Sequence, residues 1–390
     1  MILSALAIAS LPAAGPTATV TVRNPAAVER PSETIVVSGA DLAKALAVDD
    51  LRKVHVRDDK AGHELLVQAI DQDDDGTFDQ IVFQADLAPS ETRAFTASVG
   101  GRRIARLDEY KVYGRFVRER RDDFAWENDR VAHRMYGEAL ETWAQEPLTS
   151  STVDVWCKKT PKLVVNNWYL VDDYHRDLGE GADFYSAGRS RGVGGTAPWV
   201  GGRLWPSANF RGSRVIANGP VRLIFELTYA PWNVNGQSIT EVKRVTLDAG
   251  QHFNRFESRY ASAAPLPAQV AIGLKKAKGA AVDGGRETGW ISGWEAVAGQ
   301  DNGNLGLAVV LPDPAAVADV TEDDLNRLIV VPLSKDAPTV HYAGSAWDKA
   351  GQIPDAAAWR RHVEAFAARV RQPVTVSVSS GPAAPGAEVE

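Results

Sequence analysis

Charged, polar and aromatic side chains crowd into residues 126–137, whose sequence is WENDRVAHRMYG. The residues there that could bind or act on a ligand are Trp126, Glu127, Asn128, Asp129, Arg130, His133, Arg134 and Tyr136. A helix would align Asp129 with His133, but we favour one strand, with Glu127, Asp129 and His133 on one face. Arg134 and Tyr136 would then lie on the other. An ion-paired exposed surface is the alternative.

A second polar and aromatic segment, residues 166–195, is punctuated by glycines. Its candidate residues are Asn167, Trp168, Tyr169, Tyr174, His175, Glu180, Asp183 and Tyr185. A sugar cleft requires flat apolar platforms beside hydrogen-bonding carboxylates and amides, so we expect a loop at the rim of such a cleft. Trp199, Trp294 and Glu295 could add to its walls, although core packing is the alternative for the tryptophans. The functional site is therefore expected within residues 126–195.

Several other chemistries lack their sequence signatures. The glycine-rich stretch lacks the strand-to-helix context and the Gly-Lys-Ser/Thr ending of a phosphate-binding loop. No histidine spacing typical of zinc sites and no Gly-x-Ser-x-Gly elbow of serine esterases occurs. Cys157 is the one cysteine, which excludes an internal disulfide and a cysteine metal site. No motif requires a cofactor.

An acidic run at residues 71–79, DQDDDGTFD, resembles a calcium loop. Its candidate metal ligands are Asp71, Asp73, Asp75 and Asp79, and Gly76 permits the sharp turn. Val82 stands where a calcium loop has a bidentate glutamate. A structural calcium site and a hairpin with an acidic tip therefore both stay open.

Composition limits the partners of the chain. A net charge of -7 on 390 residues gives no general attraction for phosphate backbones or anionic lipid, so nucleic acid is not an expected partner. Residues 1–17 contain a short apolar core followed by small residues, which resembles a secretory signal without its basic start. No later stretch approaches the ~20 apolar residues of a spanning helix. We expect a periplasmic or secreted protein.

Short β-rich runs predict an all-β protein with few helices. Runs in residues 18–103 predict an antiparallel sandwich, and they are 19–22, 34–37, 54–56, 65–67, 80–83 and 93–96. Runs in a larger domain, residues 104–378, are 163–165, 221–229, 238–247, 253–260, 305–311 and 328–331. Asp355 can cap a helix that ends before Pro373. Residues 379–390 are expected to be disordered.

The motifs together resemble those of a bacterial family, domain of unknown function 4861. The matching runs are WENDRVAHRMYG, VWCKK, NNWY, DDYHRDLGEGADFYSAG, ANGPVRLIFELTY and SGWE, spread over nearly the whole chain. Members look like exported proteins of polysaccharide-degrading bacteria. The resemblance implies that the larger domain is a galactose-mutarotase-like β-supersandwich, a fold shared by epimerases, lyases and hydrolases, so it carries function by analogy only.

The leading hypothesis is an enzyme that cleaves uronic-acid-containing glycans by β-elimination. This reaction requires a base beside the carboxylate, an acid for the leaving oxygen and a group that stabilises the enolate. We assign the base to His175 or His133, the acid to Tyr174 or Tyr136, and the carboxylate clamp to Arg130 or Arg134.

Three alternatives remain. A glycoside hydrolase would use a carboxylate pair drawn from Glu127, Asp129, Glu180, Asp183 and Glu295. A mutarotase or epimerase would use a histidine and a glutamate without cleaving the sugar. A non-catalytic carbohydrate-binding protein would use Trp168 and Trp199 for stacking alone.

Overall fold

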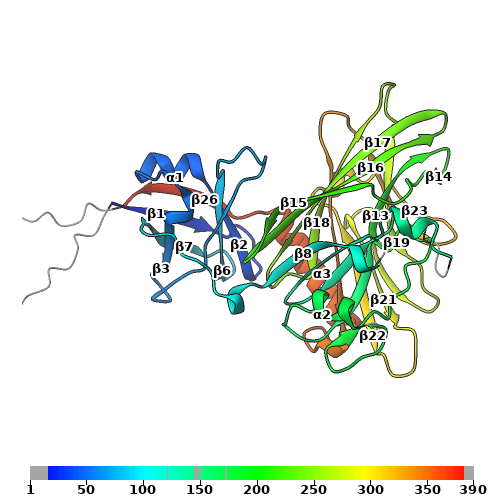
Figure 1. Ribbon diagram of the computed structural model, residues 1–390, viewed down its shortest axis with the longest axis horizontal. Coiled ribbons are helices and arrows are strands. Elements are labelled where there is room, and N and C mark those ends of the chain that lie inside the picture. The colour runs from blue at the N-terminus through cyan, green and yellow to red at the C-terminus, as the bar shows by residue number, and fades with distance from the viewer. Residues whose placement is uncertain (1–15, 121, 145–147, 149–150, 172–173, 382–390) are drawn as a thin grey trace, which may run out of the picture.

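The computed structural model describes residues 16–120, 122–144, 148, 151–171 and 174–381. Two β-rich units lie along the long axis of the molecule, the N-terminal one in blue and the larger one in cyan to orange (Figure 1). The described part contains the α-helices α1 (Gly39–Ala45), α2 (Val165–Leu170) and α3 (Ala356–Arg371). None of its helices is long and apolar enough to cross a membrane. The expected all-β class is confirmed. The proposed signal segment falls largely in residues 1–15, outside the described residues.

The N-terminal unit is a sandwich of two antiparallel sheets with the orders β26-β1-β7-β3-β4 and β2-β6-β5. Its strands are β1 (Thr17–Arg23), β2 (Arg30–Ser38), β3 (Val54–Asp58), β4 (His63–Glu64), β5 (Gln68–Ile70), β6 (Gln80–Leu87), β7 (Thr92–Val99) and β26 (Thr375–Ser380). Alternation buries Val20 and Val22 of β1 against Ile35 and Phe83 of the facing sheet. The predicted sandwich is therefore present.

Three expectations for this unit are wrong. Residues 65–67 are not a strand, because the chain there crosses from β4 in one sheet to β5 in the other. The larger domain does not extend to residue 378, and disorder does not begin at residue 379. Strand β26 pairs with β1, with Val378 opposite Val20, and so completes the first sheet. Local patterns do not reveal a partner strand that lies more than 350 residues away in the chain. Residues 382–390 lie outside the described part.

The larger unit is a two-layer β-supersandwich. One layer is an eight-stranded sheet with the order β15-β16-β17-β18-β25-β22-β21-β20. Facing it are two five-stranded sheets, β12-β11-β10-β9-β8 and β14-β13-β19-β24-β23, joined where Val153 bridges Gly192. The strands of the eight-stranded sheet are β15 (Gly212–Asn218), β16 (Arg222–Val234), β17 (Gln237–Asp248), β18 (Phe253–Ala261), β20 (Ala281–Gly285), β21 (Trp290–Ala296), β22 (Asn304–Val310) and β25 (Thr339–Trp347).

The strands of the facing layer alternate apolar side chains into the shared core. They are β8 (Val112–Val117), β9 (Asp123–Asn128), β10 (Ala132–Met135), β11 (Asp154–Lys158), β12 (Gly181–Ala182), β13 (Val193–Val200), β14 (Arg203–Leu204), β19 (Gln269–Lys275), β23 (Asp319–Glu322) and β24 (Asn326–Pro332). Buried Phe124 and Phe225, one from each layer, stack with their ring centroids 4.1 Å apart.

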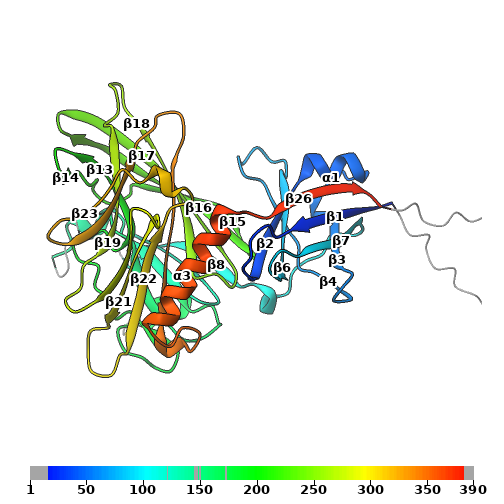
Figure 2. The ribbon, with the colours of Figure 1, turned by 180° about the vertical axis from the view of Figure 1, so that it is seen from behind.

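Local sequence explains the longest hairpin and the longest helix. Asn235 and Gly236 both have positive φ, 49° and 89°, as the tight turn between β16 and β17 requires. Asp355 caps α3 by accepting a hydrogen bond from the Ala358 amide, which confirms the predicted helix. Helix α3 lies on the outer face of the eight-stranded sheet (Figure 2), where Trp359 packs over Gly306.

Residues 163–165 do not form the predicted strand. Val165 instead begins α2, whose Val165, Trp168 and Tyr169 follow helical spacing and pack on Trp156 and Ala132. The apolar run was too short for its period to distinguish strand from helix.

Removal of β26 should destabilise the N-terminal unit. A chain that ends after Pro373 lacks β26, so one edge of β1 loses its hydrogen-bonding partner and the core beside it is exposed. The unfolding midpoint of this unit should therefore fall by at least ~5 °C. A chain ended after Gly381 keeps the strand and is the control. Differential scanning calorimetry would show the difference, and equal midpoints for the two chains would contradict the assignment of β26 to this unit.

Candidate active site

The sheet β12-β11-β10-β9-β8 presents polar residues on the face turned away from the core. Residues 126–137 form a hairpin rather than the single strand expected from their alternation. The Asn128 side chain accepts hydrogen bonds from the amides of Arg130 and Val131 at 2.8 and 2.9 Å and so fixes the turn. Because the turn shifts the alternation, Ala132 pairs with Glu127 and His133 with Trp126. Glu127 and Arg134 therefore share the outward face, and His133 faces the core.

Arg134 is the centre of a buried ion cluster on this face. Its Nε donates to Asp154 Oδ2 at 2.7 Å and its Nη2 to Asp183 Oδ2 at 2.8 Å. Its Nη1 lies 3.3 Å from the Tyr174 hydroxyl and 3.6 Å from Asp123 Oδ2. Asp154 also accepts the Tyr136 hydroxyl proton at 2.7 Å. One guanidinium thus joins β9, β10, β11 and the segment around residues 174–183.

Three carboxylates around one guanidinium favour protonation of one of them. Burial raises the pKa of Asp123 to about 7, and Arg134, Arg120 and the Tyr169 hydrogen bond reduce that shift. Asp123 Oδ1 has no hydrogen-bond partner among the described residues. Its Oδ2 accepts from the Tyr169 hydroxyl at 3.1 Å. Asp123 is therefore the carboxyl that holds a proton near neutral pH.

Aromatic rings cover the ion cluster. Trp156 stacks on Trp168 and Tyr174 at centroid distances of 5.2 and 5.5 Å. A cavity of about 100 Å³ opens beside them, and its wall includes Asn167, Trp168, Tyr174 and Glu180. Val171 and Leu178 in its wall are exposed. This combination of an apolar platform with polar groups is suited to a sugar ring.

His175 is exposed and stands in the chain between Tyr174 and Arg176, which both line the cavity. Its Nδ1 lies 3.0 Å from the backbone oxygen of Asp183 and 3.7 Å from the carboxylate of the same residue. Its ring contacts Tyr174 with centroids 4.6 Å apart. Because a carbonyl oxygen only accepts hydrogen bonds, Nδ1 carries the proton in the neutral ring and Nε2 keeps a free lone pair. Asp183 therefore holds His175 in the tautomer that a base requires.

His133 lies away from this group of residues. It is fully buried, stacks on Trp126 and has its pKa lowered to about 4 by burial. The buried Trp126 donates from Nε1 to Asn254 in the main core. Tyr185 is also in that core, and burial raises its pKa. His133, Trp126 and Tyr185 thus face the interior of the sandwich rather than the cavity.

The remaining candidate residues from the sequence lie outside the ion cluster of Arg134. Glu127 is buried and bound to Lys158 Nζ at 2.7 Å, and Asp129 accepts the Gly250 amide at 2.6 Å. Arg130 lines a separate cavity with Lys158 and Lys159. The structure does not bring three further candidates to the Arg134 cluster: Trp199, Trp294 and Glu295. Burial raises the pKa of Glu295 to about 7.

Sequence reasoning missed Asp123, Asp154 and Trp156. Asp154 begins a buried strand, DVWCK, and a carboxylate within an apolar run is a signal that it is paired in the fold. Asp123 gave no comparable signal, because it follows the highly charged run 118–122.

The acidic loop brings three of its four predicted ligands together. Oxygen atoms of Asp71, Asp73 and Asp79 lie within 4.8 Å of one another, whereas Asp75 accepts the Thr77 amide. Asp71 also accepts backbone amides from Asp74 and Gly76 at 2.7 and 2.8 Å. Calcium binding at this loop stays a prediction.

Asp123→Asn should remove a pH-dependent penalty on stability. The folded pKa lies above the unfolded value near 4, so the folded state holds this proton to higher pH, and its contribution to stability falls as pH rises from about 4 to about 7. Relative to wild type, the variant should therefore gain up to ~3 kcal/mol between pH 5 and pH 8, most of it below pH 7. Urea unfolding at both pH values measures this, and a pH-independent difference would contradict it.

Comparison with known proteins agrees with the fold. An uncharacterised protein of Formosa agariphila, P7, is 32% identical over 372 residues, which are 92% of this chain and 93% of that protein. A crystal structure of a protein in glycosyl hydrolase family 38 from Enterococcus faecalis matches with a TM-score of 0.50 and 10% identity. That match covers 96% of this chain and 50% of the other, so this chain spans about half of its length. At this identity the likeness shows the fold alone.

The family expected from the motifs is confirmed by a family model that matches residues 22–376, nearly the whole chain. The chain belongs to the family described as a domain of unknown function (DUF4861).

Proposed function

We propose that this protein is a carbohydrate-active enzyme that cleaves uronic-acid-containing glycans by β-elimination at the cavity beside Trp168 and Tyr174. The observation that carries the proposal is the placement of His175. Asp183 holds its Nδ1, its Nε2 carries the lone pair, and its exposed ring contacts Tyr174, which lines the aromatic-walled cavity. The structural neighbour, a protein in glycosyl hydrolase family 38, supports a role with carbohydrates.

His175 and Tyr174 supply a base and an acid side by side. His175 Nε2 takes the proton from the carbon next to the sugar carboxylate. Tyr174 accepts a hydrogen bond from Arg134, which leaves its own hydroxyl proton to be donated to the leaving oxygen. Burial raises the pKa of Tyr174, so this hydroxyl stays protonated. Arg134 positions both residues rather than clamping a substrate carboxylate, because protein oxygens occupy its Nε, Nη1 and Nη2.

Hydrolysis is the second candidate reaction, and the cavity supports it less well. A glycoside hydrolase places two carboxyl groups on opposite sides of the glycosidic bond. Among the described residues lining this cavity, Glu180 is the one that carries a carboxylate. Asp183 is buried and bound to Arg134. An epimerase would use His175 with Glu180 and leave the sugar uncut.

A non-catalytic binding protein would use the aromatic wall alone. We prefer an enzyme, because stacking on Trp168 does not require a histidine held in one tautomer. Export from the cell remains part of the proposal and rests on the signal-like sequence of residues 1–17.

His175→Ala should lower the cleavage rate by about 10²–10⁴-fold, because it removes the general base. Tyr174→Phe should also lower the rate, since the phenylalanine ring keeps the stack but cannot donate a proton. The assay incubates the protein with pectic, alginate, ulvan and glucuronoxylan oligosaccharides and follows near-ultraviolet absorbance and product mass. His63→Ala, at an exposed strand of the N-terminal unit, is the control and should retain full activity.

The products separate the alternatives. Elimination yields an unsaturated uronate that absorbs in the near ultraviolet, and hydrolysis adds one water without this absorbance. An uncut sugar of changed configuration would indicate an epimerase. Binding that is lost in Trp168→Ala, with no product after long incubation of the wild type, would indicate a binding protein. Full cleavage by His175→Ala would eliminate the base assignment.

A further inference from the structure

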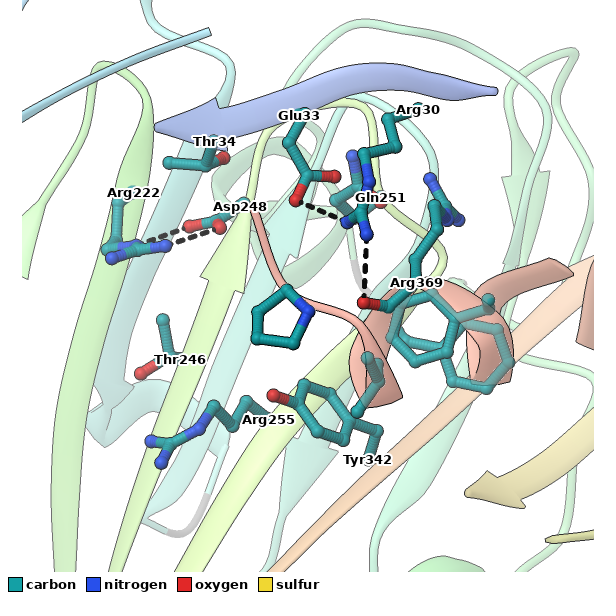
Figure 3. Close-up of a pocket in the computed structure, with 14 residues that line it drawn as sticks. Arg30, Glu33, Thr34, Arg222, Thr246, Asp248, Gln251, Arg255, Tyr342 and Arg369 are labelled. Carbon is teal, nitrogen blue, oxygen red and sulfur yellow. Dashed lines mark hydrogen bonds and ion pairs between the residues drawn. The ribbon is translucent and has the colours of Figure 1, made fainter. Parts of the chain in front are cut away.

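A cavity of about 200 Å³ lies between the two units, remote from the ion cluster of Arg134. Figure 3 shows Arg30, Glu33 and Thr34 of β2 above it and the end of α3 beside it. Strands β16, β17 and β18 of the larger unit supply Arg222, Asp248 and Arg255 among other residues. The site is thus shared by both units.

Positive charge exceeds negative charge in this cavity, since four arginines and two carboxylates line it. Arg222 holds Asp248 through two hydrogen bonds of 2.6 and 2.7 Å, and Arg30 holds Glu33 at 2.9 Å (Figure 3). Arg255 is paired with Glu257 outside the cavity wall. Both carboxylates are therefore already occupied by other arginines.

Arg369 is the remaining arginine of this cavity, and no ion pair with a carboxylate occurs for it among the described residues. Its residue is 6% exposed, and its Nε is buried without a hydrogen-bond partner among the described residues. It contacts the face of Phe366 at 5.3 Å. Burial lowers the pKa of Arg369, and the nearby Arg30 lowers it further, although Glu33 opposes them. An arginine buried in this way costs stability unless an anion compensates it.

We propose that this cavity binds a compact oxyanion, with Arg369 as its central ligand and Arg30 and Arg255 adding positive charge from either side. A planar guanidinium matches two oxygens of a carboxylate, sulfate or phosphate. The volume is below the ~300 Å³ of typical pockets for drug-sized ligands, so it fits a small anion or one charged group of a sugar. The bound anion adds attraction across the junction of the two units. This site is independent of the proposed catalytic function.

The test is isothermal titration calorimetry of the full chain at constant ionic strength, with sodium sulfate, sodium phosphate and sodium glucuronate as separate probes. Wild type should bind at least one probe with a saturable 1:1 isotherm. Arg369→Gln should weaken that binding at least ~10-fold. Arg369→Lys keeps the charge but loses the two parallel N–H donors of the guanidinium, so it should weaken binding less. Arg360→Gln on the exposed side of the same helix is the matched control and should bind as wild type does.

The probes also identify the source of the anion. Binding of sulfate or phosphate indicates a free inorganic ion, and binding of glucuronate alone indicates a sugar carboxylate. Absence of saturable binding for all three probes in wild type would overturn the proposal. Unchanged affinity in Arg369→Gln would overturn it too, and circular dichroism of each variant ensures that the comparison is between folded proteins. If Arg369→Gln does not fold, the comparison between Arg369→Lys and wild type decides, and equal affinity there overturns the proposal.

Discussion

The buried guanidinium of Arg134 constrains the geometry of the candidate site more than any other group there. It binds carboxylates from three separate parts of the chain, Asp123, Asp154 and Asp183, and all four side chains are almost completely buried. Loss of Arg134 would leave Asp154 and Asp183 buried without the guanidinium that binds both, which is strongly destabilising. The cluster therefore fixes segment 174–183 against the sheet and, with it, Tyr174 and His175.

The supersandwich supports this buried ion cluster, because the strands that carry it are packed on both faces. The opposite face of the same strands places Phe124, Trp126 and Val155 in the main core, so the sheet is rigid from behind. Helix α2 then covers the polar face with Trp168 and Tyr169. A site on packed strands holds its groups more precisely than a site on loops does. The exposed His175 gains a defined orientation from this buried support.

The sequence predicted what depends on local pattern and missed what depends on distant pairing. Alternation and capping were sufficient for β16, β17, β18 and α3, because each has a strong period and a clear end. The hairpin at Asn128 was missed because its turn lacks glycine and proline, and this one error put His133 with Glu127 on the wrong common face. Segments 126–137 and 166–195 do meet through Arg134 and Asp183, but no local pattern identifies such a pair.

The charges around the two cavities bear on how an anionic glycan would bind. Beneath the cavity beside Trp168, Arg134 binds Asp154 and Asp183, and Arg120 acts on Asp123 as well. A charge on Asp123 would add to the repulsion of a uronate. The raised pKa of Asp123 keeps that group neutral up to about pH 7. The aromatic stack of Trp156, Trp168 and Tyr174 also separates the cluster from the opening. Stacking and a neutral Asp123 would together permit an anionic sugar to approach His175 in the proposed reaction. At the junction between the units, the proposed anion ligand is Arg369, whose Nε has no hydrogen-bond partner among the described residues.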